Sequence, residues 1–127
     1  MSKYVIDSYA WIEYIDGTQT GRELQKLLEK NEEVYTSVIT VAEVVSKAAR
    51  RNKDAKLAYD ILLNNSQIVR VDEELSWAAG LLHTEMRKTE KDFGLADAYV
   101  LATARKLKAK ILTGDPHFKN VKDAILM

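Results

Sequence analysis

Short runs of β-branched and aromatic residues alternate with amphipathic segments along the chain, and this alternation limits its possible folds more than any other feature. Strand-like runs lie at residues 4–6, 34–36, 67–71 and 110–113, with a short fifth candidate at 124–127. Between them, apolar residues recur at helical spacing. Strands separated by helices predict βαβ crossovers. We therefore expect an α/β fold with three layers (α/β/α) and a central, mainly parallel sheet of four to five strands.

Composition sets further limits on the class of protein. The 127 residues show no repeat and no Pro/Gly/Ser linker, so we expect one domain over residues 1–127. The absence of cysteine excludes a disulfide scaffold, a thiolate metal site and a cysteine nucleophile. Charged residues interrupt every segment long enough to span a membrane, and residues 1–20 lack a signal-peptide pattern. These observations predict a cytoplasmic protein without membrane contact.

Four acidic residues fall where strands end or helices begin. Asp7 directly follows the first strand, and Glu43 lies in the first turn of a helix that we expect to open at Thr40. Asp97 lies in the first turn of the helix before the fourth strand, and Asp115 follows that strand. A crossover helix runs antiparallel to its strands, so these positions all lie at the carboxyl edge of the sheet, where ligands bind in such folds.

Each acid also has a purely structural interpretation. Asp7 and Asp115 suit helix N-caps, Glu43 completes a capping box with Thr40, and Asp97 favours a helix dipole. Taken together, however, several carboxylates beside apolar residues repel one another unless a cation neutralises them. Oxygen ligands without cysteine or histidine suit Mg²⁺ or Mn²⁺. The chemistry typical of such a site is in-line hydrolysis at phosphorus.

Four motifs along the chain resemble those of a known family. They are YVIDS at 4–8, TVAEV at 40–44, LADAYVLATA at 95–104 and ILTGDPHF at 111–118. In this order they are similar to the PIN-domain family of metal-dependent ribonucleases, which includes the VapC-type toxins of toxin–antitoxin pairs. The resemblance implies a PIN-like domain that hydrolyses RNA phosphodiester bonds with Mg²⁺ or Mn²⁺. It also implies an antitoxin protein as a partner, and a homodimer.

The resemblance also assigns roles to individual residues. It implies that the catalytic and metal-binding set is Asp7, Glu43, Asp97 and Asp115, with Thr113 as a supporting hydroxyl. One position departs from the family pattern. A small polar residue usually stands two positions after the first aspartate, and here that residue is Tyr9, so we expect Ser8 to supply the hydroxyl instead.

Other residues have two interpretations each. Arg50, Arg51 and Lys53 form a basic cluster that either contacts RNA phosphates or is a solvated helix end, because the net charge of zero requires a local basic patch for any polyanion. His117 either binds phosphate or moves a proton, but we expect a structural or peripheral role. Trp11, Tyr14 and Ile15 form an apolar stripe that suits the core, and the resemblance adds a groove for a partner's helix or a dimer surface, so both interpretations can hold in part.

Competing functions remain open at this point. The same residues suit an RNA-processing PIN nuclease without an antitoxin, or a catalytically inactive PIN-fold binding module. A phosphatase that forms an aspartyl phosphate on Asp7 would need a second acid two positions on, where Tyr9 stands. The complete set of four acids argues against the inactive module, because a carboxylate cluster without a ligand only destabilises a fold.

Overall fold

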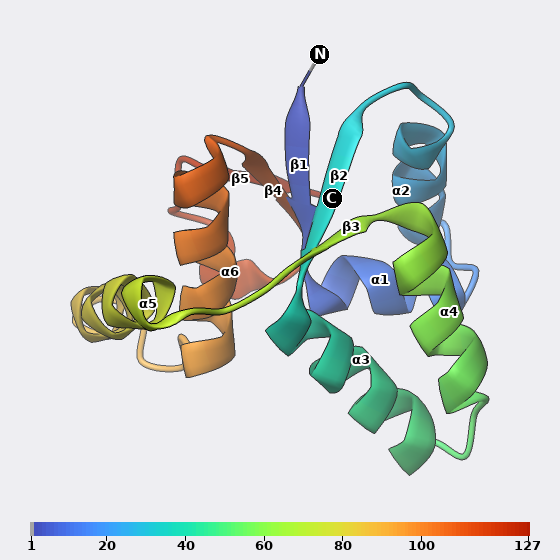
Figure 1. Ribbon diagram of the computed structural model, residues 1–127, viewed down its shortest axis with the longest axis horizontal. Coiled ribbons are helices and arrows are strands. Elements are labelled where there is room, and N and C mark those ends of the chain that lie inside the picture. Colours follow the sequence, from blue (N-terminus) through green and yellow to red (C-terminus); the bar gives the residue numbers. More distant parts are fainter. Residues whose placement is uncertain (1) are drawn as a thin grey trace.

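A computed structural model describes residues 2–127 and shows a five-stranded, entirely parallel sheet, as the alternation of strands and helices predicts. The strands are β1 (Lys3–Ile6), β2 (Glu33–Ser37), β3 (Gln67–Val69), β4 (Lys110–Thr113) and β5 (Ala124–Leu126). Their order in the sheet is β3-β2-β1-β4-β5, so the first strand of the chain is central (Figure 1). Its neighbour β4 comes from the other end of the chain, with Ile6 paired to Leu112.

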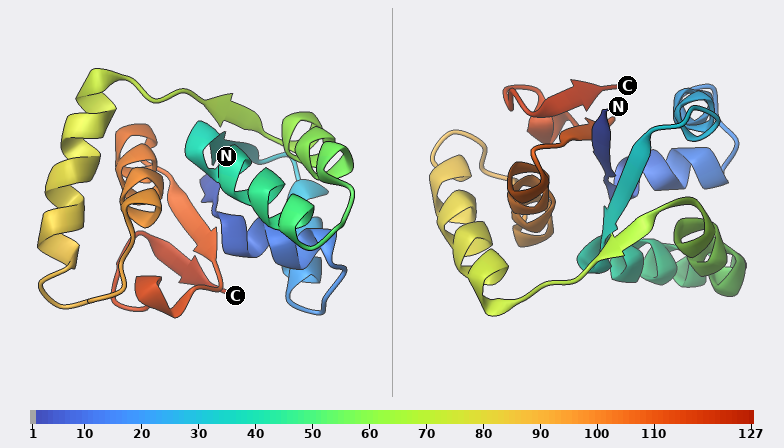
Figure 2. Two further views of the ribbon diagram at one scale, coloured as in Figure 1. Left: turned by 90° about the horizontal axis from the view of Figure 1, so that it is seen from below. Right: turned by 45° about the horizontal axis from the view of Figure 1, so that its top comes forward.

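Helices cover both faces of the sheet, which confirms the expected α/β/α layers. They are α1 (Ser8–Ile15), α2 (Gly21–Leu28), α3 (Val38–Arg50), α4 (Ala55–Asn65), α5 (Glu73–Met86) and α6 (Leu95–Leu107), and a short 3₁₀ helix, η1, spans Pro116–Phe118. Helices α1 to α4 share one apolar core, and α5 and α6 share another. The two groups lie on opposite sides of β1 in both views (Figures 1 and 2).

The core beneath α1 to α4 is fixed by a buried tryptophan. Trp11 is fully buried, and its indole N–H donates a hydrogen bond of 3.0 Å to the Thr36 hydroxyl on β2. A buried donor without a partner would cost free energy, so this bond sets the position of α1 against the sheet. The core interpretation of Trp11 is therefore confirmed. The side chain is not available to a partner.

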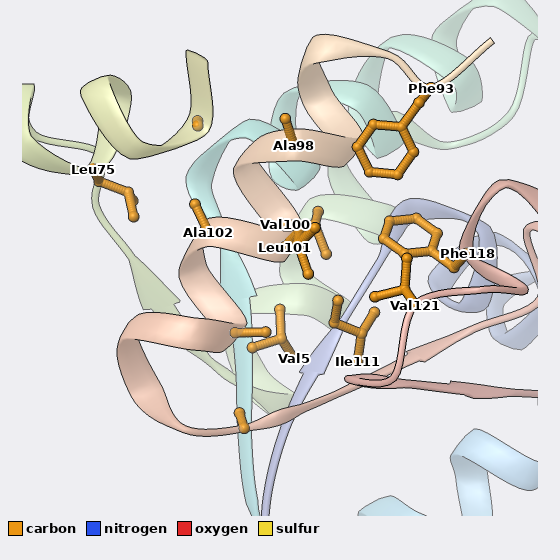
Figure 3. Packing of buried hydrophobic residues seen from close by; sticks show 13 residues of the cluster. Val5, Leu75, Phe93, Ala98, Val100, Leu101, Ala102, Ile111, Phe118 and Val121 are labelled. Carbon is orange, nitrogen blue, oxygen red and sulfur yellow. The ribbon is translucent and has the colours of Figure 1, made fainter. Parts of the chain in front are cut away.

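The second core holds together two segments that are far apart in sequence. Phe93 precedes α6, Phe118 ends η1, and their rings pack edge to face with centroids 5.4 Å apart (Figure 3). Both side chains are buried against Ile111 and Val121. An edge-to-face pair has a preferred geometry, so this contact fixes the start of α6 relative to the segment after β4.

Several boundaries differ by one or two residues from the sequence expectation, and β1 and β2 begin one residue earlier than expected. Helix α3 begins at Val38 rather than Thr40, because the Ser37 side chain accepts a hydrogen bond from the Ile39 N–H and caps the helix directly after β2. Strand β3 ends at Val69, two residues early, because its register with β2 ends where Ser37 pairs with Val69. Strand β5 ends at Leu126. Within residues 2–127, no helix is long and apolar enough to cross a bilayer.

Candidate metal centre at the carboxyl edge of the sheet

Asp7 is the most buried acid of the site, with 4% of its surface exposed. It caps α1, with Oδ1 accepting a hydrogen bond of 2.9 Å from the Ala10 N–H, while the Thr113 hydroxyl donates to Oδ2. Burial, together with the charges of Asp115 and Asp97, raises the pKa of Asp7 to about 7 against the effect of the two hydrogen bonds. Asp7 is therefore a helix cap and an electrostatically unfavourable charge at the same time.

Glu43 lies on α3, one turn further into the helix than the sequence suggests. Because Ser37 caps this helix, the expected capping box between Thr40 and Glu43 is wrong, and the Glu43 side chain is not used to cap the helix. Burial raises its pKa, and the charges of Asp97 and Asp115 raise it too, while the Ser8 hydroxyl lowers it. Glu43 therefore lies within electrostatic range of acids from α6 and from the segment after β4.

Asp97 stands at the third position of α6, where Oδ2 accepts a hydrogen bond of 2.8 Å from the Gly94 N–H. This bond, from the backbone N–H of the N-cap residue to the side chain at the third helical position, is one of the two bonds of a capping box, so Asp97 does stabilise the start of α6. Burial nevertheless raises the pKa of Asp97 above its usual range, and the charge of Asp115 raises it too. The Gly94 N–H and His117 act in the opposite direction.

Asp115 and His117 belong to the turn after β4. Asp115 Oδ1 accepts a hydrogen bond of 2.9 Å from the His117 N–H, and the Asp115 N–H donates to the Thr113 hydroxyl at 2.9 Å. The imidazole of His117 turns back toward the acids, with Nδ1 3.4 Å from Asp115 Oδ1 and 3.6 Å from Asp97 Oδ2. Asp115 thus caps η1, as its position before Pro116 predicts.

His117 is the member of the site that sequence reasoning placed at its periphery. Its Nδ1 atom is buried and has no hydrogen-bond partner among the described residues. The distances to the two carboxylates exceed those of an ordinary N–H···O bond. Donor atoms of Asp97, Asp115 and His117 all lie within 4.8 Å of one another, so the three side chains could hold one metal ion. The position of His117, two residues after Asp115, was the available signal.

The four acids thus come from four elements and meet at one edge of the sheet. The pKa values of Asp7, Glu43 and Asp97 rise mainly through burial and partly through the neighbouring negative charges, which is the behaviour of like charges confined to a small volume. The Thr113 hydroxyl donates to Asp7, and the Ser8 hydroxyl lies beside Glu43. A divalent cation would remove this repulsion, and the oxygen-rich donor set fits a hard cation.

The basic cluster divides into two parts. Arg50 lines a cavity of about 540 Å³ together with Glu43 and Asp115. Arg51 and Lys53 instead pair with Asp16 at the end of α1, at 3.1 and 2.9 Å. A second cationic side chain, Lys47, also lines the cavity, and it was not identified from the sequence. Spacings of four and three residues place Glu43, Lys47 and Arg50 on one face of α3, and this pattern was visible in the sequence.

A parallel sheet with acidic side chains at its carboxyl edge defines an α/β protein with a candidate site for a hard cation. The chain belongs to the PIN-domain family, whose model, described as PIN domain, matches residues 4–124. The motif resemblance is therefore confirmed. No curated protein matches the chain significantly in sequence.

Several solved structures share the fold over nearly the whole chain. VapBC2 from Rickettsia felis, bound to a DNA fragment from its promoter, has a TM-score of 0.77 at 21% identity, covering 98% of this chain and 97% of that one. VapC20 of Mycobacterium tuberculosis, a sarcin–ricin loop cleaving toxin, has a TM-score of 0.76 at 22% identity, covering 94% and 95%. A toxin–antitoxin complex from Klebsiella pneumoniae has 0.73 at 19%, covering 96% and 95%.

Proposed function

We propose that this protein is an endoribonuclease that depends on Mg²⁺ or Mn²⁺ and hydrolyses RNA phosphodiester bonds. The observation that carries the proposal is the convergence of Asp7, Glu43, Asp97 and Asp115, from four separate elements, on one edge of the sheet. The raised pKa values of Asp7, Glu43 and Asp97 mean that the ionised cluster is costly without a cation. Such a cluster is difficult to explain as helix punctuation alone.

The residues present fit a divalent metal. Asp97, Asp115 and His117 are the group whose donor atoms lie closest together, and Asp7 and Glu43 are coupled to that group through their charges. When bound, Mg²⁺ or Mn²⁺ supplies a Lewis acid and lowers the pKa of a coordinated water. Carboxylates and an imidazole without a thiolate are compatible with either ion.

The chain's own residues have distinct tasks in this proposal. The Thr113 hydroxyl and the Ala10 N–H hold the Asp7 carboxylate in one orientation. Lys47 and Arg50 line the same cavity as Asp115 and lie on the same helix as Glu43, so they attract a phosphate group that the four acids would otherwise repel. This local pair of cations is needed because the whole chain has no net charge.

We further propose that the enzyme is the toxin of a toxin–antitoxin pair in the cytoplasm and forms a homodimer. The shared fold with structures from VapBC systems supports an antitoxin as partner. An apolar cavity of about 230 Å³ between α1, α3 and α4, lined by Ile12, Ile15, Val44 and Leu57 among others, is available to a partner's side chain. The exposed Trp77 and Leu81 on α5 offer an apolar surface to a second copy.

The test is cleavage of RNA by the purified protein with added Mg²⁺ or Mn²⁺ and with chelator. We expect cleavage only with metal, and a large loss for Asp97→Asn and Glu43→Gln. Cleavage at an undiminished rate in excess chelator would refute the metal mechanism. RNA binding without cleavage under any condition would favour the inactive PIN-fold module. Active enzyme without a neighbouring gene for a small DNA-binding protein would favour an RNA-processing nuclease.

A further inference from the structure

Tyr9 is the aromatic side chain at the rim of the acid-lined cavity. It lies in the first turn of α1, two positions after Asp7, and 41% of its surface is exposed. The ring lines the same cavity of about 540 Å³ as Glu43, Asp115 and Arg50. It belongs to neither of the two apolar cores among the described residues. The ring is therefore not part of the packing of either core.

Gly114 explains how the ring is held in place. A Cβ atom at Gly114 would overlap the ring of Tyr9, so the ring rests directly on the backbone of the turn that precedes Asp115. The backbone of Gly114 does not have a positive φ, so its conformation does not require glycine. Glycine is therefore favoured at position 114 because any side chain there would collide with the Tyr9 ring.

The cavity combines three kinds of side chain. Acids line it from α3 and from the turn after β4, cations line it at Lys47 and Arg50, and a supported but exposed ring lines it at Tyr9. Proteins that bind single-stranded nucleic acid use this combination, with cations along the phosphates and aromatic rings beneath the bases. A ring with only two side-chain torsions, already held against backbone, loses little conformational entropy on stacking.

We propose that Tyr9 is the stacking platform for one nucleobase of single-stranded RNA, adjacent to the phosphate that is cleaved, with Arg50 and Lys47 on flanking phosphates. This inference rests on the proposed ribonuclease function and adds the form of the substrate. A base within a duplex has both faces covered by its neighbours, so it cannot stack on a side chain. Tyr9 therefore selects RNA in which at least one base is unpaired at the cleavage site.

The experiment measures the affinity for short single-stranded RNAs in which one base at a time is removed to leave an abasic position. Ca²⁺ replaces Mg²⁺, and a gel verifies that the RNA stays intact. With wild-type protein we expect one position to matter, with a loss of roughly 10- to 100-fold for that abasic RNA. Tyr9→Ala should bind intact RNA more weakly by the same factor and become indifferent to that base. Tyr9→Phe and Tyr9→Trp should keep the dependence.

Two further variants make the result specific. Tyr59 on α4 is similarly exposed, at 38%, and does not line the cavity, so Tyr59→Ala should behave as wild type. Gly114→Ala should displace the ring and reproduce the effect of Tyr9→Ala, with no additional loss when both changes are combined. Unchanged melting temperatures and unchanged Mn²⁺ binding by calorimetry show that the variants keep the fold and the metal site.

The inference is overturned if Tyr9→Ala keeps the wild-type dependence on one base, or if no abasic position matters to wild type while RNA is still bound and cleaved. Wild-type protein that neither binds nor cleaves RNA overturns the proposed function itself. Equal affinity for single strands and for fully paired duplex RNA, with cleavage of both, overturns the preference for an unpaired base and leaves the nuclease activity in place.

Discussion

Replacing Asp7 by asparagine should stabilise the metal-free protein, although it removes a buried and hydrogen-bonded side chain. The pKa of Asp7 is about 7 in the folded protein against 3.8 for an unperturbed carboxyl. A folded pKa above the unfolded value means that Asp7 is most favourable to stability at low pH. That contribution is lost as the pH rises toward 7, because the folded state resists ionisation. Asparagine has the same shape and no charge to bury.

The size of the effect follows from the difference in pKa. Each pKa unit corresponds to about 1.4 kcal/mol, so the ionised Asp7 costs about 4 kcal/mol near pH 8 and less than about 1 kcal/mol near pH 4. The amide of asparagine faces the Thr113 hydroxyl, whose oxygen already accepts from the Asp115 N–H, so we subtract about 1 kcal/mol for that hydrogen bond. Asp7→Asn should therefore be about 3 kcal/mol more stable than wild type near pH 8 and slightly less stable near pH 4.

The assay is urea denaturation with excess chelator, followed by tryptophan fluorescence near pH 4, 6 and 8. Asp16→Asn is the matched control with the opposite sign, because hydrogen bonds and charge from Lys53 and then Arg51 lower the pKa of Asp16. That variant should lose stability, most clearly at high pH. An Asp7→Asn protein that is destabilised equally at every pH would refute the electrostatic argument and leave Asp7 as a helix cap.

Metal should narrow the difference in stability between the two proteins. A metal at 100 times its dissociation constant adds about 2.7 kcal/mol to the wild type, and Asp7→Asn should gain less because one ligand charge is gone. If Mg²⁺ and Mn²⁺ stabilise both proteins by the same amount, Asp7 does not contribute to metal binding.

Three further tests use variants in separate parts of the structure. Arg50→Ala should lower the slope of log affinity for RNA against log salt concentration by roughly 0.7. Arg51→Ala should leave this slope closer to that of wild type. Equal reductions of the slope in both variants would show that the whole cluster contacts RNA. Gly21→Ala should lower the free energy of unfolding, measured in urea, by about 1–3 kcal/mol, because the added Cβ would overlap the backbone of α1. Gly80→Ala is the control: its added Cβ meets open space, so it should raise the free energy of unfolding by about 0.5–1 kcal/mol. His117→Ala should weaken Mn²⁺ binding in calorimetry by about tenfold or more and Mg²⁺ binding by less, and equal effects on both ions would argue against a nitrogen ligand.

The fold was largely readable from the sequence because periodicity and the order of elements determine it. The five strands and their parallel arrangement follow from β-branched runs that alternate with helical stripes, and the structure confirms them. Boundaries were less certain where two residues compete for one role. Ser37 and Thr40 are both residue types that favour the N-cap position. Because β2 pairs with β3 as far as Ser37, the strand ends there and Ser37 becomes the N-cap of α3.

The candidate site was predictable in its acids and less so in its surroundings. Each acid sits next to a strand or helix end, and such ends meet at one sheet edge in a parallel fold. The direction of Arg51 and Lys53 depends on Asp16, which lies about 35 positions earlier in the chain, and no local pattern reveals that pairing. The inward turn of His117 likewise depends on Asp97 from α6.

Because β1 lies in the middle of the sheet, the residues of the site are synthesised at widely separated times. Asp7 is synthesised before the strand beside it, because β4 and Asp115 come only after residue 109. Until then the nascent chain has an open edge at β1 and lacks both the hydroxyl that orients Asp7 and the turn that supports Tyr9. A nuclease of the proposed kind would therefore acquire its complete site only when β4 and the turn after it have been made, and could not attack the RNA of the ribosome before that point.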